Sequence, residues 1–324
     1  MSTAPSSGAT DLLVNPEADG SRLDVFLVRT LHLSRAKVKK MFEQGAIRVD
    51  GRRAKKGDSI KVGQNVRVVL GPSDDSVTPD PDAPLSVLHC DSALVFLDKA
   101  AGIPSHPLES GELGTLANAL VARFPECATA AADPREGGLC HRLDVDTSGV
   151  IVAARSAATW QRMREAFSRG AIDKRYLALV AGPIADEGEI DVPLRHRAAR
   201  RGSGVEPALA GGVGARRAES VFRVLGRSSD YALVEVRIIT GVLHQVRAHL
   251  ASIGAPVVGD ALYGGRSDPS LIRFFLHALS LELNHPETQA RLKVESPLPE
   301  DLARVLARLG IAAGPAIPTR PSPV

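Results

Sequence analysis

Hydrophobic positions near the start of the chain follow the period of an α-helix twice in succession. One face consists of Leu23, Phe26, Leu27 and Thr30, and the next consists of Val38, Met41 and Phe42. Ser21 and Ser34 precede these faces as candidate N-terminal caps, and Gly45 follows the second as a candidate C-terminal stop. The pattern therefore predicts two short helices that pack through their apolar faces.

After the second helix, the pattern changes to the alternation that is typical of strands. Residues 46–49 predict a strand and Asp50-Gly51 a tight turn, and alternation continues through Ile60, Val62, Val66 and Val68. Two helices followed by a small sheet predict a domain over residues 21–70, and a unit of about fifty residues is large enough to fold. The tail before it, residues 1–20, has room for a first strand.

Residues 71–84 interrupt the hydrophobic pattern with four prolines and four aspartates, which predicts a flexible linker. Beyond it, a larger domain is expected over 85–308. Its strand-like segments are 85–90, 93–98, 175–180, 231–240 and 279–283, and its helical segments are 115–124 and 158–169. Because these segments alternate without a regular βαβ rhythm, they predict an α+β fold with a mixed, mainly antiparallel sheet. Residues 200–215 predict a flexible insertion and 309–324 a disordered tail.

Positive charge is concentrated in the small domain. Between Ser34 and Val68, eleven basic residues stand against three acidic ones, a net charge of +8. Since the whole chain carries +3, the remainder carries −5. A solvated charged face usually mixes both signs, whereas an excess of one sign in one module indicates a polyanion as partner.

Several classes of site lack their sequence patterns. Three scattered cysteines predict reduced thiols, with Cys140 as a packed one, and the spacing of His244 and His249 does not suit a metal on one helical face. Residues 211–217, GGVGARR, fail the dinucleotide-binding pattern. The first twenty residues lack the features of a signal peptide, and no apolar run is long enough for a membrane helix. We expect a cytoplasmic monomer without a metal.

Residues 141–156, HRLDVDTSGVIVAARS, place polar side chains immediately before an apolar run. Considered alone, this string predicts a turn at the edge of a buried strand, with Asp144 and Asp146 as local caps. The segment HRLDVDTSG nevertheless resembles the signature of the RluA-type pseudouridine synthases. Further segments resemble that family in its order, namely FLDKAAGIPSHP (96–107), KRYLALVAG (174–182), RAES (217–220), TGVLHQVRAHLASIGAPVVGDALYGG (240–265) and LHALSLELNHPETQ (276–289).

Residues 21–69 in turn resemble the S-four-type RNA-binding domain, named for a small-subunit ribosomal protein. The resemblance implies that the second helix and the following turn contact structured RNA. The basic residues expected to do so are Arg35, Lys39, Lys40, Arg52, Arg53, Lys55 and Lys56. Contacts of this kind neutralise phosphates and position a protein without reading the base sequence.

The family resemblance implies roles for individual residues. It implies that Asp144, Tyr176 and Arg247 are the catalytic residues. Asp144 would be the essential carboxylate, Tyr176 would stack on the target base, with proton transfer as a second role left open, and Arg247 would pair with Asp144. Arg142 would help to displace the flipped uridine, since a planar guanidinium can fill a vacated stack. The expected substrate-binding residues are Arg142, Thr147, His244 and Gln245.

The implied reaction moves uracil from an N1 to a C5 bond with the ribose. No atom is gained or lost, so neither a cofactor nor a metal is required. One carboxylate is enough, either as nucleophile or as the base that removes a ribose proton, and the sequence leaves both roles open. A hydrolytic N-glycosidase would normally need a second carboxylate to activate water.

Other interpretations concern the activity and the target. A noncatalytic ribosome-assembly factor on the same fold would explain the basic module but not the occupied Asp, Tyr and Arg positions. Among RNAs, large-subunit ribosomal RNA is favoured over transfer RNA, because family members with this N-terminal module often act there. Val242-Leu243 and Lys99-Ala100 depart from the family pattern, and the first pair removes one polar contact expected near the site.

Overall fold

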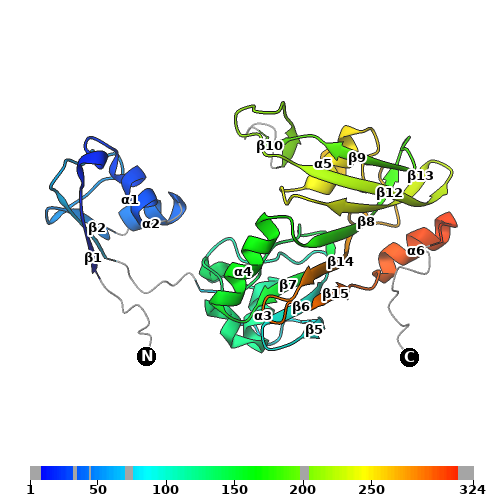
Figure 1. Cartoon of the computed structure of the whole chain (residues 1–324), viewed down its shortest axis with the longest axis horizontal. Helices are drawn as coiled ribbons and strands as arrows, with labels where there is room; N and C mark the ends of the chain where they lie inside the picture. The colour runs from blue at the N-terminus through cyan, green and yellow to red at the C-terminus, as the bar shows by residue number, and fades with distance from the viewer. Residues whose placement is uncertain (1–8, 32–34, 44, 70–75, 198–203, 313–324) are drawn as a thin grey trace. The chain divides into compact units, whose positions relative to one another are not determined.

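The computed structural model of the chain describes residues 9–31, 35–43, 45–69, 76–197 and 204–312 (Figure 1). Two compact units divide the chain, Met1–Asp74 and Asp75–Val324. In neither unit does a described helix have the length and apolar character needed to cross a membrane.

The described part of the first unit forms a four-stranded antiparallel sheet with two helices. In order across the sheet, the strands are β1 (Ala9–Leu13), β4 (Asn65–Val69), β2 (Ile47–Val49) and β3 (Arg52–Arg53). The helices are α1 (Leu23–Leu31) and α2 (Arg35–Glu43), and a short 3-10 helix spans Pro16–Ala18. Leu23, Leu27 and Val38 from the helices pack against Ile47 and Val66 from the strands. The predicted helices and sheet are therefore present, and the segment before residue 21 supplies a strand.

The ends of these elements match the predicted signals in part. Gly45 adopts a φ of +70°, and the N–H of Ala46 donates to the Met41 carbonyl at 3.0 Å, a glycine stop. The prediction of Ser21 as a cap is wrong, because its hydroxyl donates to the Ala18 carbonyl at 2.6 Å. The predicted cap Ser34 lies outside the described residues, and two predicted apolar-face positions, Thr30 and Val62, are exposed.

The described residues of the second unit build a nine-stranded sheet. Its strands are β5 (Val87–Cys90), β6 (Leu94–Lys99), β7 (Ser148–Ala154), β14 (Leu276–Asn284), β8 (Asp173–Ala181), β13 (Tyr231–Ile238), β12 (Glu219–Ser228) and β9 (Glu187–Asp191), in that order, with β15 (Arg291–Glu295) also beside β14. Only the β7–β14 pair is parallel among these described strands. The predicted α+β fold with a mainly antiparallel mixed sheet is confirmed.

Helices cover both faces of the β6–β7 part of the sheet. They are α3 (Leu116–Arg123) and α4 (Ala157–Ser168), whereas α5 (Gln245–Ser252) lies against β13. The last helix of this unit is α6 (Glu300–Leu309). Along β7, Ile151 belongs to the core cluster that contains Leu120 of α3, whereas Val150 and Val152 belong to the cluster with Met163 of α4. A strand covered on both faces needs the unbroken apolar run that follows the HRLD segment.

The predicted flexible linker over 71–84 is wrong for its second half. Val77 is only 3% exposed and belongs to the main core of the second unit. The Thr78 carbonyl accepts a hydrogen bond from the Asn118 side chain at 2.7 Å. Residues 76–84 thus pack on this unit, because one apolar side chain and one backbone acceptor find partners there. Residues 71–75 lie outside the described ranges.

Two further predicted flexible segments are partly ordered. Within 200–215, β11 (Val205–Pro207) pairs with β10 (Leu194–His196), and Val205 is fully buried, whereas 200–203 lie outside the described residues. Within the predicted tail, Ile311 is 4% exposed and packs into the main core. The prediction of disorder is therefore wrong at these positions, and residues 313–324 lie outside the described ranges.

Candidate active site

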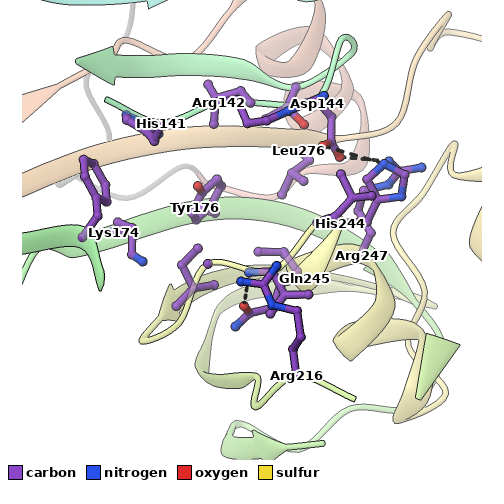
Figure 2. Close-up of a pocket in the computed structure, with 18 of the residues that line it drawn as sticks. His141, Arg142, Asp144, Lys174, Tyr176, Arg216, His244, Gln245, Arg247 and Leu276 are labelled. Atoms are coloured by element: carbon purple, nitrogen blue, oxygen red, sulfur yellow. Dashed lines mark hydrogen bonds and ion pairs between the residues drawn. The ribbon is translucent and has the colours of Figure 1, made fainter. Parts of the chain in front are cut away.

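A pocket of about 460 Å³ lies where the HRLD segment, β8 and the start of α5 meet (Figure 2). Segments far apart in sequence reach it because β14 pairs with β7 on one edge and β8 on the other. The polar lining residues are His141, Arg142, Asp144, Thr147, Arg164, Lys174, Tyr176, His196, Arg216, His244, Gln245 and Arg247. Asp144 is the single carboxylate among the described lining residues, so the wall is otherwise neutral or basic.

Asp144 and Arg247 face each other in this pocket. The Arg247 Nη1 donates to Asp144 Oδ2 at 2.9 Å, so the pairing expected from the sequence is present (Figure 2). The Asp144 side chain is 18% exposed, whereas that of Arg247 is 7% exposed. One carboxylate oxygen is thus bonded to the protein while the group keeps access to the pocket. The His244 Nε2 lies 3.8 Å from the other oxygen.

A second carboxylate, Asp260, holds Arg247 from behind. Its two oxygens accept from Arg247 Nε at 2.6 Å and Nη2 at 3.0 Å, and its side chain is 1% exposed. The rings of Phe274 and Tyr263 lie 4.2 and 5.1 Å from the guanidinium carbon. Burial lowers the pKa of Arg247, but the two carboxylates outweigh it and raise that pKa above its ordinary value. Arg247 is therefore a fixed cation with one N–H aimed at Asp144.

The sequence interpretation did not assign Asp260. It lies thirteen residues after Arg247 within the segment that resembles the family, but no helical or strand period connects the two positions. Nothing local in the sequence distinguishes a buried partner of Arg247 from an ordinary loop aspartate.

The loop that carries Asp144 is held by side chains beneath it. The ammonium of Lys99, which is fully buried, donates to three backbone carbonyl oxygens, those of Ala100, Ile103 and Val145. Burial lowers the pKa of Lys99 to about 7, while the charges of Asp144 and Asp146 act to raise it. The Ser105 hydroxyl donates to the carbonyl of Leu143 and accepts from its N–H. These bonds fix the backbone on both sides of Asp144.

Gly149 allows the loop to enter the sheet. Its φ is +124°, and a Cβ atom there would lie 2.2 Å from the carbonyl oxygen of Ala278 on β14. Next to it, the Ser148 hydroxyl bonds with the His277 ring at 3.0 Å. No other residue type permits this approach of β7 and β14, which accounts for the glycine in the DTSG segment.

Tyr176 lies on β8 with its ring in the pocket, between Lys174 and Asp144 (Figure 2). The residue is 9% exposed. Burial and the charge of Asp144 raise the pKa of Tyr176, which keeps the hydroxyl protonated at neutral pH. The position suits the stacking role that the sequence implies, since a flat ring faces the space beside the carboxylate.

Among the predicted substrate-binding residues, Thr147 and Arg142 have side-chain groups that make no hydrogen bond to the described residues. The Thr147 hydroxyl is buried and has no hydrogen-bond partner among the described residues. Arg142 is exposed at the pocket, and among the described residues its guanidinium makes no hydrogen bond or ion pair. Buried polar groups in proteins are nearly always paired, so the unpaired Thr147 hydroxyl is an exception in this pocket wall.

The side chains of Gln245 and His244 contact other residues of the protein. The Gln245 amide, in a residue 2% exposed, accepts from Thr240 and Val242 and donates to Glu219 and Ser220. Its geometry therefore suits positioning of the loop before α5. His244 adopts a φ of +52°, and its Nδ1 lies 3.1 Å from the Tyr263 hydroxyl. Burial lowers the pKa of His244, although Asp144 acts to raise it.

Val242 and Leu243, which depart from the family pattern, have a packing role in the structure. Val242 and Leu243 line the pocket and pack against the cluster formed by Leu194, Val205 and Ala248. An apolar pair here extends the contact with the β10–β11 hairpin. Cys140 is buried, and burial raises the pKa of its thiol, so the prediction of a packed thiol agrees with the structure.

The predicted RNA-binding residues of the first unit divide by position. Lys39, Arg52, Arg53, Lys55 and Lys56 are exposed, whereas the side chains of Arg35 and Lys40 lie outside the described part. The Arg53 guanidinium donates to the Glu43 carbonyl at 3.1 Å and so joins β3 to the end of α2. Lys39 pairs with Glu43 at 3.6 Å across one helical turn. Over the described residues, no group of His, Cys, Asp and Glu could hold a metal.

Comparison with known proteins identifies the family of each unit. A family model described as RNA pseudouridylate synthase matches residues 93–252, and an S4 domain model matches residues 21–66. The chain is 33% identical over 318 residues to the ribosomal large subunit pseudouridine synthase D of Xanthomonas campestris, covering 94% of this chain and 93% of that protein. It is 34% identical over 307 residues to the protein of the same name from Nitrosomonas europaea, covering 91% and 86%.

A solved structure is similar as well. The protein titled Human RNA Pseudouridylate Synthase Domain Containing 4 matches with a TM-score of 0.55 and 26% sequence identity. The match covers 69% of this chain and 93% of that one. The likeness therefore extends over most of the larger unit, where the pocket lies.

Proposed function

Since the chain belongs to the RNA pseudouridylate synthase family and isomerises uridine to pseudouridine in RNA, we propose that it acts on large-subunit ribosomal RNA with Asp144 as the catalytic carboxylate. The observation that carries the assignment of Asp144 is its place in the pocket, ion-paired with Arg247 at 2.9 Å and beside the Tyr176 ring. One oxygen of Asp144 accepts from Arg247, and its remaining oxygen is available to the ribose.

Each neighbour of Asp144 has a part in this proposal. The target uridine leaves its stack and enters the pocket, where its base lies against Tyr176. Arg142, exposed and unpaired among the described residues, takes the space that the base vacates. Thr147 hydrogen-bonds the bound nucleoside, and Gln245 and His244 hold the loop before α5. Arg247 acts through Asp144, which it orients, and so is a positioning residue.

The number of available carboxylates favours isomerisation over hydrolysis. A hydrolytic enzyme would need a second carboxylate to activate water. Asp260 is the nearby candidate, but both of its oxygens bond to Arg247 and its side chain is 1% exposed. Asp260 therefore has no oxygen with which to activate a water molecule. Without such a water, the detached base can bond to the ribose again through C5.

Ribosomal RNA is proposed as the target on two grounds. Relatives that match nearly the whole chain are named for the large ribosomal subunit. The first unit matches the S4 domain model and exposes Arg52, Lys55 and Lys56 on one short segment, which suits docking on structured RNA. We further propose that the protein is cytoplasmic. We also propose that it is a monomer, because one chain supplies the complete pocket, and light scattering of the purified enzyme tests this oligomeric state.

The target can be tested with unmodified transcripts. Large-subunit ribosomal RNA and a pool of transfer RNAs, both made in vitro, would be incubated with enzyme, and pseudouridines would be mapped chemically. We expect new pseudouridine at one or a few sites in the ribosomal transcript and none with Asp144→Asn. Modification of transfer RNA alone would contradict the proposed target while leaving the activity intact. Mapping in cells with and without the gene would then identify the uridine.

A further inference from the structure

Lys174 is a buried cation on the pocket wall without a carboxylate partner among the described residues. Its residue exposure is 4%, and its Nζ donates to one protein acceptor, the Thr240 carbonyl, at 3.0 Å. The neighbouring Asp173 pairs with Arg175 and Arg237 on the opposite side of β8. An ammonium has three N–H donors, so two remain for a ligand in the pocket.

The position of Lys174 relative to Tyr176 indicates which part of a ligand it meets. The two residues lie two apart on β8 and both line the pocket, so their side chains point to the same face (Figure 2). Residues two apart on a strand are separated by roughly 7 Å. A pyrimidine lying against the Tyr176 ring therefore brings the oxygens at its edge toward the Lys174 ammonium.

We infer that Lys174 is a further catalytic residue, whose positive charge stabilises the uracil anion released when the N1–C1′ bond breaks. The inference rests on the proposed function. In that step, the electron pair of the broken bond goes to the uracil and spreads onto its carbonyl oxygens. Either Asp144 forms a bond to C1′, or it takes the proton from C2′; both routes leave the same anion. As C5 then bonds to C1′, the Asp144–C1′ bond breaks in the first route, and in the second Asp144 returns its proton to C2′. Finally C5 loses its proton to solvent, and N1 takes one up.

A backbone phosphate is the other anionic oxygen that RNA could offer to Lys174. The burial of Lys174 argues against a phosphate contact, because the RNA backbone follows the protein surface whereas Lys174 is almost fully buried. Arg164, which is exposed and lines the same pocket, is better placed for a phosphate. Burial lowers the pKa of Lys174 to about 8, with Asp173 acting to raise it, so most of the ammonium stays charged at pH 7.

The test compares Lys174→Gln and Lys174→Met with the unsubstituted enzyme and with Lys293→Met. Gln can keep a hydrogen bond to the Thr240 carbonyl, and Lys293 is a half-exposed control on β15, away from the pocket. Tritium release from C5-labelled RNA would be followed in a single turnover with enzyme in excess. RNA affinity at several salt concentrations would be measured in an Asp144→Asn background, and thermal melting would report folding.

We expect both neutral variants to lower the single-turnover rate by about 10²–10³-fold, the usual cost of removing one preorganised charge-stabilising donor. RNA affinity should stay within about twofold, and melting should be unchanged or raised, because a buried charge has been removed. Lys293→Met should behave like the unsubstituted enzyme.

Two results would overturn the inference. One is a folded Lys174 variant with the full single-turnover rate. The other is weaker RNA binding, with a salt slope reduced by about one and an unchanged rate, which would assign Lys174 to a phosphate. If the unsubstituted enzyme itself released no tritium from any RNA, the proposed function would fail and this inference with it.

Discussion

Asp260 is the residue whose removal should show most directly how the pocket orders Asp144. Asp260→Asn keeps the shape of the side chain but removes its charge. The amide oxygen can still accept one of the two Arg247 N–H groups, whereas the amide nitrogen faces the other as a second donor. Breaking a buried ion pair on one side costs about 3–5 kcal/mol. Since Arg247 keeps Asp144 as a partner, we expect the lower end, about 3 kcal/mol.

That loss should appear as a lower melting temperature of the second unit. For a unit of this size, 1 kcal/mol corresponds to about 2–4 °C, so a fall of about 6–12 °C is expected. Trp160, the one tryptophan of the sequence, lies on α4 within the second unit and bonds to the Leu139 carbonyl. Its fluorescence therefore reports unfolding of this unit separately from the first. A matched control is Asp230→Asn, which removes an exposed ion pair with Arg266 worth at most about 1 kcal/mol and should lower the melting temperature by no more than about 2–4 °C.

Turnover should fall together with stability. Without Asp260, the Arg247 guanidinium can rotate between its ring neighbours, and the Asp144 carboxylate loses a fixed partner. Misplacement of a reacting group by 1 Å can cost about 10²-fold in rate, and we expect a loss of this order in tritium release below the melting temperature. An unchanged melting temperature together with full turnover would refute the proposed role of Asp260 in holding Arg247. A destabilised variant with full turnover would show that Asp260 stabilises the fold without orienting Asp144.

Three further predictions follow from the same site and its neighbouring unit. Asp144→Asn should bring tritium release below detection while melting and RNA affinity persist; substantial release would remove Asp144 from the chemistry. Tyr176→Phe keeps the stacking ring, so RNA affinity should be unchanged, and turnover should fall about tenfold or more if the hydroxyl handles a proton; equal turnover would leave the ring as the functional part. Deleting residues 1–75 should leave the second unit folded, with similar turnover at saturating RNA. If three or four phosphate contacts are lost, the slope of log affinity against log salt should flatten by about three. The cut precedes Val77, which belongs to the core of the second unit. Unchanged affinity and slope would show that the first unit does not dock the RNA tested.

Local patterns were sufficient for the features that depend on neighbouring residues. The helices of the first unit, the glycine stop at Gly45 and the buried strand after the HRLD segment all follow from periods and turn chemistry within a few residues. The excess of basic residues is a property of composition and needs no fold to detect it. The resemblance of short motifs identified Asp144, Tyr176 and Arg247, and the structure brings these three into one pocket.

Tertiary structure decided the partners that sequence distance hides. Asp144 and Arg247 are 103 positions apart, and Lys99 reaches the Val145 carbonyl across 46, so no local period relates them. Asp260 holds Arg247 only because the fold buries both side chains together, with two aromatic rings beside the guanidinium. Likewise, a stretch rich in proline and aspartate is ordered because Val77 finds a core to enter. The composition of a segment shows how little apolar surface it can bury by itself. Whether its backbone is ordered depends on whether other parts of the fold provide a surface on which it can pack.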